Sequence, residues 1–262
     1  MTRVLSAVVL LAIVIGTVWF LPPLATLVFA LVVSVLAFHE YADLSARLGA
    51  RIPRVVCGAA VAAVCALVGV GAPVVIALLS ALIIIGALAV AAGRPGPDAL
   101  LNASAAMLPL IYIGVPLGAL AQIRSAAGRE AVLLLAIVII VSDSAQYYTG
   151  RALGRRPLAP AISPKKTVEG AIGGMVCATA AFAIGGRWLF PLTSVLLLVV
   201  GGAVLGAVGI VGDLFESLLK RSAGVKDSSA LIPGHGGVLD RIDSWLFAAP
   251  VFYVFINYAV SP

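Results

Sequence analysis

AVLLLAIVIIVSDSAQYY, residues 131–148, decides the fold class, because eleven apolar residues run without a break into Ser142 and Asp143. A bilayer core about 30 Å thick needs about 20 apolar residues of helix. Eight further runs of this kind cover residues 4–20, 24–38, 55–70, 73–92, 99–120, 168–184, 193–212 and 245–260. Continuous rather than alternating apolar sequence favours helices over a membrane barrel. The sequence therefore predicts an all-α, polytopic integral membrane protein with about nine transmembrane helices.

The overall composition excludes an ordinary soluble domain. Of the 262 residues, 62% are hydrophobic and 11% are charged, whereas soluble domains have about 45–50% apolar residues. The net charge of +6 does not indicate nucleic acid binding, since basic loops in membrane proteins mainly report orientation. No linker or repeat divides the chain. We therefore expect a single membrane-embedded domain over residues 1–262, with N-terminal spans in 1–130 and a catalytic part in 131–262.

The loops between the runs differ in charge. With nine spans, the N-terminus and the loops after the second, fourth, sixth and eighth spans share one side. That side carries all of the 17 basic residues except Arg124, Arg129 and Arg187. The positive-inside rule places this side in the cytoplasm. We therefore expect a multi-pass protein of the cell membrane, with the N-terminus in the cytoplasm and the C-terminus outside.

Two polar segments interrupt the apolar sequence, residues 142–170 and residues 213–244. Together they contain every lysine and seven of the 11 acidic residues. A carboxylate at the bilayer centre costs about 2.5–3.5 kcal/mol, so acids that adjoin apolar runs usually face a polar cavity. Asp143 and Asp213 are such acids. Because the predicted orientation puts both segments on the same side, the sequence predicts a cytoplasm-facing polar site.

The second polar segment begins as the end of a helix. Asp213, Glu216, Ser217 and Lys220 are spaced i, i+3, i+4 and i+7, which places them on one helix face. This face is either an amphipathic helix end with internal ion pairs or one wall of a binding site. The residues that follow favour the binding site.

The glycine-rich stretch PGHGG, residues 233–237, precedes Asp240 and Asp243. Glycine permits positive φ and lets backbone amides approach a ligand closely, as in phosphate-binding loops, although ordinary turns use the same residues. Asp240 and Asp243 are i, i+3 neighbours and can face one cavity. Carboxylates suit Mg²⁺, and neighbouring lysines and arginines suit a triphosphate. The alternative is that these acids only cap the last helix.

Other polar residues allow more than one interpretation. Lys165 and Lys166 lie in SPKKTVEG, residues 163–170, a cluster that a plain positive-inside loop explains poorly. His235 could be a general base, a hydrogen-bond donor to phosphate, or a turn residue. His39 and Glu40, at the end of the second run, are interpreted as an interfacial pair rather than as part of a site.

Taken together, these motifs resemble those of the phosphatidate cytidylyltransferases, also called CDP-diacylglycerol synthases. The resemblance covers about the last 120 residues closely. It rests on Ser217, Lys220, Arg221, Lys226, Asp227, PGHGG, Asp240, Arg241 and Asp243, and on Asp143, Ser144, Tyr147, Gly150 and SPKKTVEG. Gln146 departs from the pattern, which has a small residue before the tyrosine.

The resemblance implies that CTP and the membrane lipid phosphatidate react to give CDP-diacylglycerol and pyrophosphate for phospholipid synthesis. It implies Mg²⁺ as the cofactor, with a second monovalent or divalent cation left open, and a membrane-embedded homodimer. It also places the metal-binding aspartates of the family at Asp213 and Asp240. Catalysis would proceed mainly by positioning and charge neutralisation.

From the sequence and the resemblance we predict these site residues. The predicted catalytic residues are Asp213, Asp240, Lys220, Arg221, Lys226 and Asp227, with Asp213 and Asp240 as the metal ligands. The predicted substrate-binding residues are Asp143, Ser163, Lys165, Lys166, Ser217, His235, Gly236, Gly237, Arg241 and Asp243.

Two other functions remain as alternatives. A membrane transporter would also use intramembrane acids, but it predicts inverted repeats and polar residues spread along the spans. Here the polar residues are concentrated on one side. A CTP-dependent lipid kinase would share the membrane site and the nucleotide, and only the fate of the α-phosphate separates it from a cytidylyltransferase.

Overall fold

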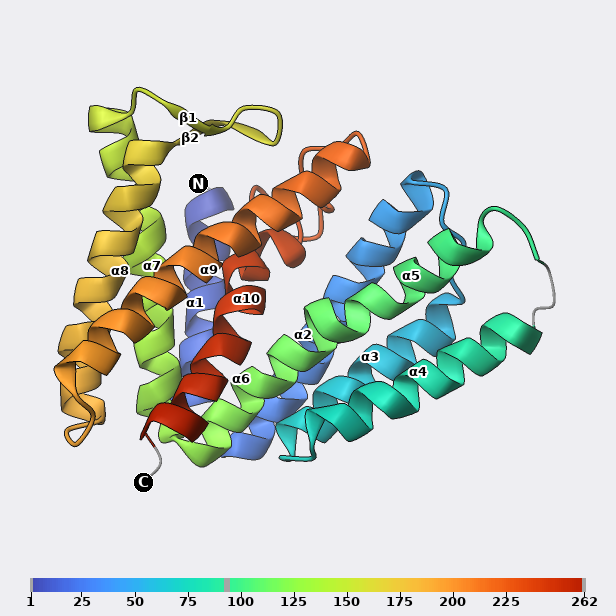
Figure 1. Ribbon diagram of the computed structural model, residues 1–262, viewed down its shortest axis with the longest axis horizontal. Coiled ribbons are helices and arrows are strands. Elements are labelled where there is room, and N and C mark those ends of the chain that lie inside the picture. The colour runs from blue at the N-terminus through green and yellow to red at the C-terminus, as the bar shows by residue number, and fades with distance from the viewer. Residues whose placement is uncertain (1, 92–94, 261–262) are drawn as a thin grey trace. The chain divides into compact units, whose positions relative to one another are not determined.

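The computed structural model describes residues 2–91 and 95–260, and of residues 2–7, 10, 259 and 260 only the backbone. Arg94, one of the basic residues behind the predicted orientation, lies outside the described residues. The described chain is almost entirely helical (Figure 1). Its helices are α1 (Thr2–Ile15), α2 (Pro23–Arg47), α3 (Arg54–Gly69), α4 (Val74–Ala91), α5 (Ala99–Pro109), α6 (Val115–Ala126), α7 (Gly128–Leu153), α8 (Val168–Leu189), α9 (Val195–Ser222) and α10 (Leu239–Phe255). Short π-helical segments η1 (Gly16–Phe20), η2 (Leu110–Gly114) and η3 (Ile256–Val260) extend or join them, and β1 (Pro157–Ala159) pairs with β2 (Ser163–Thr167).

The predicted all-α membrane fold is confirmed in its main features. Within the described residues, six helices are long and apolar enough to cross a membrane, namely Pro23–Arg47, Val74–Ala91, Ala99–Ala126, Gly128–Leu153, Val168–Leu189 and Val195–Ser222. Two more predicted runs correspond to shorter apolar helices, Leu11–Phe20 and Arg54–Gly69. The last predicted run lies in α10 and η3. The count of nine spans stays a prediction.

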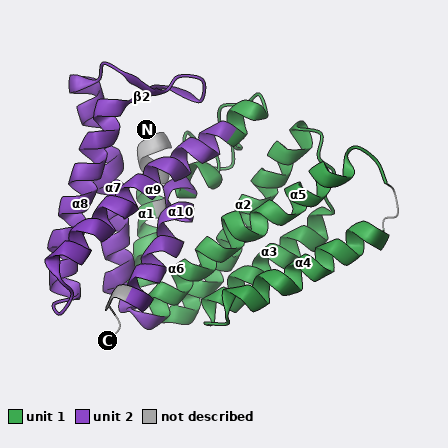
Figure 2. Cartoon of the chain, in the orientation of Figure 1, with its two compact units in different colours: residues 1–125, 219–242 green, residues 126–218, 243–262 purple. Residues whose placement is uncertain are grey.

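The chain divides into two compact units (Figure 2). Unit 1 comprises residues 1–125 and 219–242, and unit 2 comprises residues 126–218 and 243–262. The predicted single domain, with its catalytic part over 131–262, stays a prediction. The units differ from the predicted N-terminal and catalytic parts. Residues 219–242, which lie in the predicted catalytic part, belong to the same unit as the N-terminal helices.

Unit 1 is built on α2, which packs against α3, η2 and α5. Its core is formed by apolar side chains such as Phe38, Val61 and Ile113, all nearly inaccessible to solvent. The Tyr41 hydroxyl donates a hydrogen bond to the Ala105 carbonyl oxygen (3.1 Å) and so ties α2 to α5. This packing fixes the end of α2 that carries Glu40.

Unit 2 is built on α7 and α8, which pack along each other, and on α9 and α10. Four phenylalanines, Phe182, Phe190, Phe252 and Phe255, form an aromatic cluster, with Phe182 edge-on to Phe255 at a centroid separation of 5.2 Å. Gly202 of α9 lets α8 approach closely, because a Cβ there would lie 2.8 Å from Thr179 Cα.

A β-hairpin connects α7 to α8 at one end of this helix pair (Figure 1). Thr167 caps α8, its hydroxyl accepting a hydrogen bond from the Gly170 amide (3.1 Å). Glu169 accepts hydrogen bonds from the amides of Arg155 (3.0 Å) and Arg156 (3.2 Å), just before β1. Both ends of the hairpin are thus fixed to the start of α8. Lys165 and Lys166 lie on β2, so their backbone positions in unit 2 are fixed as well.

We expect Gly202→Ala to destabilise the protein by about 1–3 kcal/mol, because the added methyl group would overlap the backbone of α8. The control is Gly86→Ala in α4, where a Cβ meets nothing within 4 Å and alanine favours the helix. Unfolding curves of both purified variants in detergent measure the difference. Equal stability of the two variants would contradict the close α8–α9 packing.

Candidate active site

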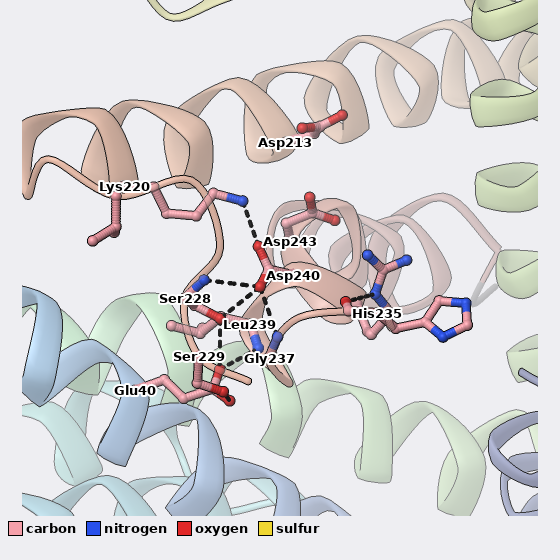
Figure 3. Close-up of polar contacts among 12 residues, drawn as sticks. Glu40, Asp213, Lys220, Ser228, Ser229, His235, Gly237, Leu239, Asp240 and Asp243 are labelled. Atoms are coloured by element: carbon pink, nitrogen blue, oxygen red, sulfur yellow. Dashed lines mark hydrogen bonds and ion pairs between the residues drawn. The ribbon is translucent and has the colours of Figure 1, made fainter. Parts of the chain in front are cut away.

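Asp240, in the first turn of α10, lies at the centre of a polar network in unit 1 (Figure 3). Its Oδ1 accepts a hydrogen bond from Lys220 Nζ of α9 at 2.5 Å. Its Oδ2 accepts from the Ser228 amide (2.9 Å), the Ser228 hydroxyl (2.8 Å) and the Gly237 amide (2.7 Å). The side chains of Asp240 and Lys220 are only 5% and 12% exposed. The structure therefore brings together the predicted residues Lys220, Gly237 and Asp240.

The same contacts control the ionisation of Asp240, which precedes the apolar part of α10. Burial raises the pKa of this carboxyl, but the Lys220 ammonium and the hydrogen bonds from Gly237 and Ser228 outweigh burial and hold the pKa below its usual value. Since the folded-state pKa is lowered, the stabilisation is present above the ordinary aspartate pKa of about 4 and is lost only as the pH falls below it. Asp240 is thus a permanent anion near neutral pH.

Glu40 of α2 belongs to this network, although the sequence interpretation set it aside as an interfacial residue. It is 4% exposed, and its carboxylate accepts hydrogen bonds from the Ser229 hydroxyl (2.6 Å) and the Val238 amide (2.8 Å) on Oε1. On Oε2 it accepts from the Ser228 hydroxyl (2.9 Å) and the Leu239 amide (2.8 Å). The interpretation of Glu40 as an interfacial pair with His39 is wrong for Glu40, while His39 is exposed. The available signal was an acid at the end of an apolar run, the same signal that marked Asp143.

The glycines of PGHGG, residues 233–237, allow the backbone to approach Glu40 and Ser228 closely. Gly234 and Gly236 have φ of 77° and 80°, a region that favours glycine. Gly237 has no room for a side chain, because a Cβ would collide with the Ser228 hydroxyl and lie 2.5 Å from both Glu40 oxygens. The amides of residues 237–239 therefore donate to carboxylates of the chain itself.

Other predicted residues of unit 1 lie around this network. Arg241 Nε donates to the His235 carbonyl oxygen (3.1 Å), and Arg221 donates to the Val225 carbonyl oxygen (3.1 Å). The His235 imidazole points away from Asp240 (Figure 3). Lys226 and Asp227 are exposed. These side chains are accessible to a ligand from solvent, whereas Asp240 and Glu40 are enclosed.

A second group of predicted residues lies within unit 2. Lys166 of β2 forms an ion pair with Asp213 of α9. Asp143 of α7 and Asp243 of α10 are close enough for their charges to interact with Asp213 and with Lys166. Asp213 thus contacts Lys166 directly, and the acids of two further helices lie within range of its charge. Of the remaining predicted residues, Ser163 and Lys165 lie on β2, and Ser217 lies on α9, one turn after Asp213.

Gln146, the residue that departs from the family pattern, lies in this second group. Its amide donates to Asp143 Oδ1 (3.2 Å) and approaches the Ser142 hydroxyl (3.5 Å). Its side chain fits against Gly174 of α8, where a Cβ would collide with it. The larger residue on α7 is therefore accommodated by the absence of a side chain on α8, and it gives Asp143 a hydrogen-bond donor.

A sequence profile of the cytidylyltransferase family matches residues 1–259 of this chain. The chain belongs to this family. It is 36% identical over 188 residues to the phosphatidate cytidylyltransferase of Helicobacter pylori (strain J99), covering 72% of this chain and 67% of that protein. It is 42% identical over 151 residues to the phosphatidate cytidylyltransferase of Bacillus subtilis (strain 168), covering 56% and 55%. The uncharacterized protein YnbB of Escherichia coli (strain K12) is 47% identical over 131 residues, covering 50% and 44%. The chain thus spans about half to two thirds of the length of these relatives.

The acids of unit 2 have the donor type, carboxylate oxygen, that a divalent cation prefers. Mg²⁺ prefers carboxylate oxygens and usually takes one or two of them together with substrate phosphates and water. Asp143, Asp213 and Asp243 carry more negative charge than Lys166 neutralises, and the ammonium of Lys166 already stands beside Asp213 as a cation would. Among residues 2–91 and 95–260, no group of three or more His, Cys, Asp or Glu side chains is arranged so that it could hold a metal ion.

We expect Gly237→Ala to lower the stability of the protein by about 1–3 kcal/mol, because the methyl group would push Ser228 and Glu40 apart. Gly96→Ala in the same unit, where a Cβ meets nothing within 4 Å, is the control. Thermal unfolding in detergent compares the two with the unchanged protein. An unchanged melting temperature for Gly237→Ala would show that the residue 237–239 amides are not held against these carboxylates.

Proposed function

We propose that this protein transfers the cytidylyl group of CTP to phosphatidate, giving CDP-diacylglycerol and pyrophosphate. The observation that carries the proposal is the family match over residues 1–259, together with relatives that are phosphatidate cytidylyltransferases by name. The arrangement of lysines, arginines and carboxylates in the two units supports it, since both substrates are anionic phosphates.

The reaction is a single displacement at phosphorus. A phosphate oxygen of phosphatidate attacks the α-phosphorus of CTP, the bond between the α-phosphorus and the bridging oxygen breaks, and pyrophosphate leaves with that oxygen. The phosphate monoester is already ionised at neutral pH and needs little help from a base. Catalysis therefore depends on bringing two anions together and neutralising the charge that develops on the leaving group.

In unit 2, we assign Mg²⁺ binding to Asp213, with Asp143 and Asp243 as further or supporting ligands. The bound ion would neutralise phosphate charge. Lys166 screens the three carboxylates from one another and, with Lys165, offers ammonium groups to phosphate oxygens. Ser163, on β2, and Ser217, on α9, are assigned as further hydrogen-bond donors. A second cation stays a prediction.

In unit 1, we assign phosphate binding to the basic residues Lys220, Arg221, Lys226 and Arg241. Asp240 holds Lys220 in place through the 2.5 Å contact. Metal binding by Asp240, as the family resemblance implies, stays a prediction. It would require a cation to share or replace the Lys220 contact on Oδ1, because Oδ2 already has three donors. His235 and Asp227 are assigned to the rim of the site.

The proposed setting is the cell membrane, with the polar segments facing the cytoplasm, where CTP is found. In this proposal the N-terminus is cytoplasmic, the C-terminus lies outside, and nine helices cross the bilayer. A homodimer belongs to the same proposal. The concentration of basic residues on one side of the predicted spans supports this orientation.

The purified protein, supplied with phosphatidate and CTP labelled at the α-phosphate, should transfer the label into lipid and release unlabelled pyrophosphate. EDTA should abolish the transfer and added Mg²⁺ should restore it, because the developing charge needs a cation. Release of labelled CDP without labelled lipid would instead identify a lipid kinase. Intact CTP, together with solute uptake into proteoliposomes, would identify a transporter.

Asp213→Asn should reduce this transfer at least about a hundredfold, because the amide keeps the shape of the side chain but lacks the charge that binds a cation. Asp98→Asn, which removes one exposed acid from unit 1, is the matched control and should leave turnover unchanged. Turnover per folded protein, at saturating and limiting Mg²⁺, is the measurement. Near-normal turnover of Asp213→Asn at limiting Mg²⁺ would refute its role as a metal ligand.

A further inference from the structure

Glu40 makes four hydrogen bonds to residues that are 188–199 positions away in the sequence. Two come from backbone amides at the start of α10, and two come from the hydroxyls of Ser228 and Ser229 (Figure 3). A carboxylate with its two oxygens each taking two donors is close to saturated. No arrangement of this kind is needed to pack α2, whose apolar contacts are supplied by residues such as Phe38 and Tyr41.

We infer that Glu40 is a positioning residue for the proposed cytidylyl transfer, and that it acts on Asp240 and Lys220 through Ser228 and through the amides of Val238 and Leu239. The inference rests on the proposed function. Glu40 touches no reacting group in this arrangement, so it is not a catalytic residue. It fixes the segment of residues 228–239, which begins and ends on the network around Asp240.

The first link is between Glu40 and the start of α10. The first amides of a helix lack partners within the helix, and the helix dipole favours a negative charge beside them. Glu40 supplies this charge from α2, with 2.8 Å contacts to the amides of Val238 and Leu239. Because Asp240 is the next residue, fixing these two amides also fixes the direction in which α10 presents its carboxylate.

The second link is the Ser228 hydroxyl, which lies between two carboxylates. It is 2.9 Å from Glu40 Oε2 and 2.8 Å from Asp240 Oδ2. A hydroxyl has one proton and can donate fully to only one acceptor at a time. Movement of one carboxylate therefore changes the donor available to the other, and Glu40 and Asp240 are coupled through a single atom.

The third link is between Asp240 and Lys220. Three donors hold Oδ2 of Asp240, so that Oδ1 is presented to Lys220 Nζ at 2.5 Å. Lys220 is one of the residues assigned to phosphate binding. A change at Glu40 should therefore reach the substrate through the placement of the Lys220 ammonium, without any loss of a substrate contact at Glu40 itself.

The test compares Glu40→Gln, Ser228→Ala and the double variant in the labelled-CTP assay, with His39→Gln as the neighbouring, exposed control. Glutamine keeps the size of the side chain but turns an acceptor into a donor that faces other donors. We expect kcat per folded protein to fall about 10–100-fold in Glu40→Gln, as for other residues that orient a site, and to stay unchanged in His39→Gln.

Because Glu40→Gln disturbs both routes, the double variant should lose little more than Glu40→Gln alone. Losses that multiply in the double variant, or a lower melting temperature of Glu40→Gln with normal kcat per folded protein, would overturn the inference. Ser228→Ala removes only one hydroxyl, so it tests the same link if Glu40→Gln does not fold. If Glu40→Gln does not fold, normal kcat and KM in Ser228→Ala would overturn the inference that Glu40 acts through Ser228.

A second measurement does not depend on the proposed function. Hydrogen–deuterium exchange of residues 228–239 should be slow in the unchanged protein and in His39→Gln, and at least about tenfold faster in Glu40→Gln. Unchanged exchange in Glu40→Gln would overturn the positioning role. If the unchanged protein transfers no label, the proposed function fails, while fast exchange in Glu40→Gln would still support the anchoring of this segment by Glu40.

Discussion

A carboxylate enclosed in an apolar protein requires a cation or several hydrogen-bond donors, because the loss of water is otherwise too costly. In unit 1 this requirement is met twice in one small volume. Glu40 takes the Ser229 hydroxyl and two amides, Asp240 takes two amides and the Lys220 ammonium, and the two carboxylates share the single proton of the Ser228 hydroxyl. Almost every donor comes from residues 228–239, a segment in which five of the 12 residues are apolar and Leu239 is fully buried. The order of this segment therefore depends on these two carboxylates as well as on hydrophobic packing.

The local backbone follows from the same requirement. Amides of residues 237–239 can converge on two carboxylates only if the chain turns sharply just before α10, and Gly234 and Gly236 supply positive φ for that turn. Gly237 leaves the space that Ser228 and Glu40 occupy. A glycine-rich loop that resembles a phosphate cradle thus serves first to bind carboxylates of its own chain. Substrate binding by Gly236 and Gly237 stays a prediction, as does phosphate binding by the lysine and arginine side chains around the network.

The sequence predicted the helical membrane fold in its main features, because continuous apolar runs indicate helices directly and the described part of each predicted run is mostly helical. It also identified Asp240, Lys220 and Gly237 as neighbours, since they lie within one polar segment. It missed Glu40, because a contact between residues 40 and 228 has no signature in local spacing. The pairing of Lys166 with Asp213 likewise joins a hairpin to a distant helix. Sequence motifs identify the residues of such a site, whereas the hydrogen-bond and ion-pair partners of each residue depend on tertiary packing.

The acids of the two units differ in the cations and hydrogen-bond donors that balance their charge. Asp240 has a lysine and three further donors, so its negative charge is balanced by the protein. Asp143, Asp213 and Asp243 have Lys166 as their shared cation, with Gln146 donating to Asp143 and the Ser244 amide donating to Asp243. Like charges at short range repel strongly in a medium less polar than water. The protein's own cations and donors therefore leave the acids of unit 2 less fully balanced than Asp240.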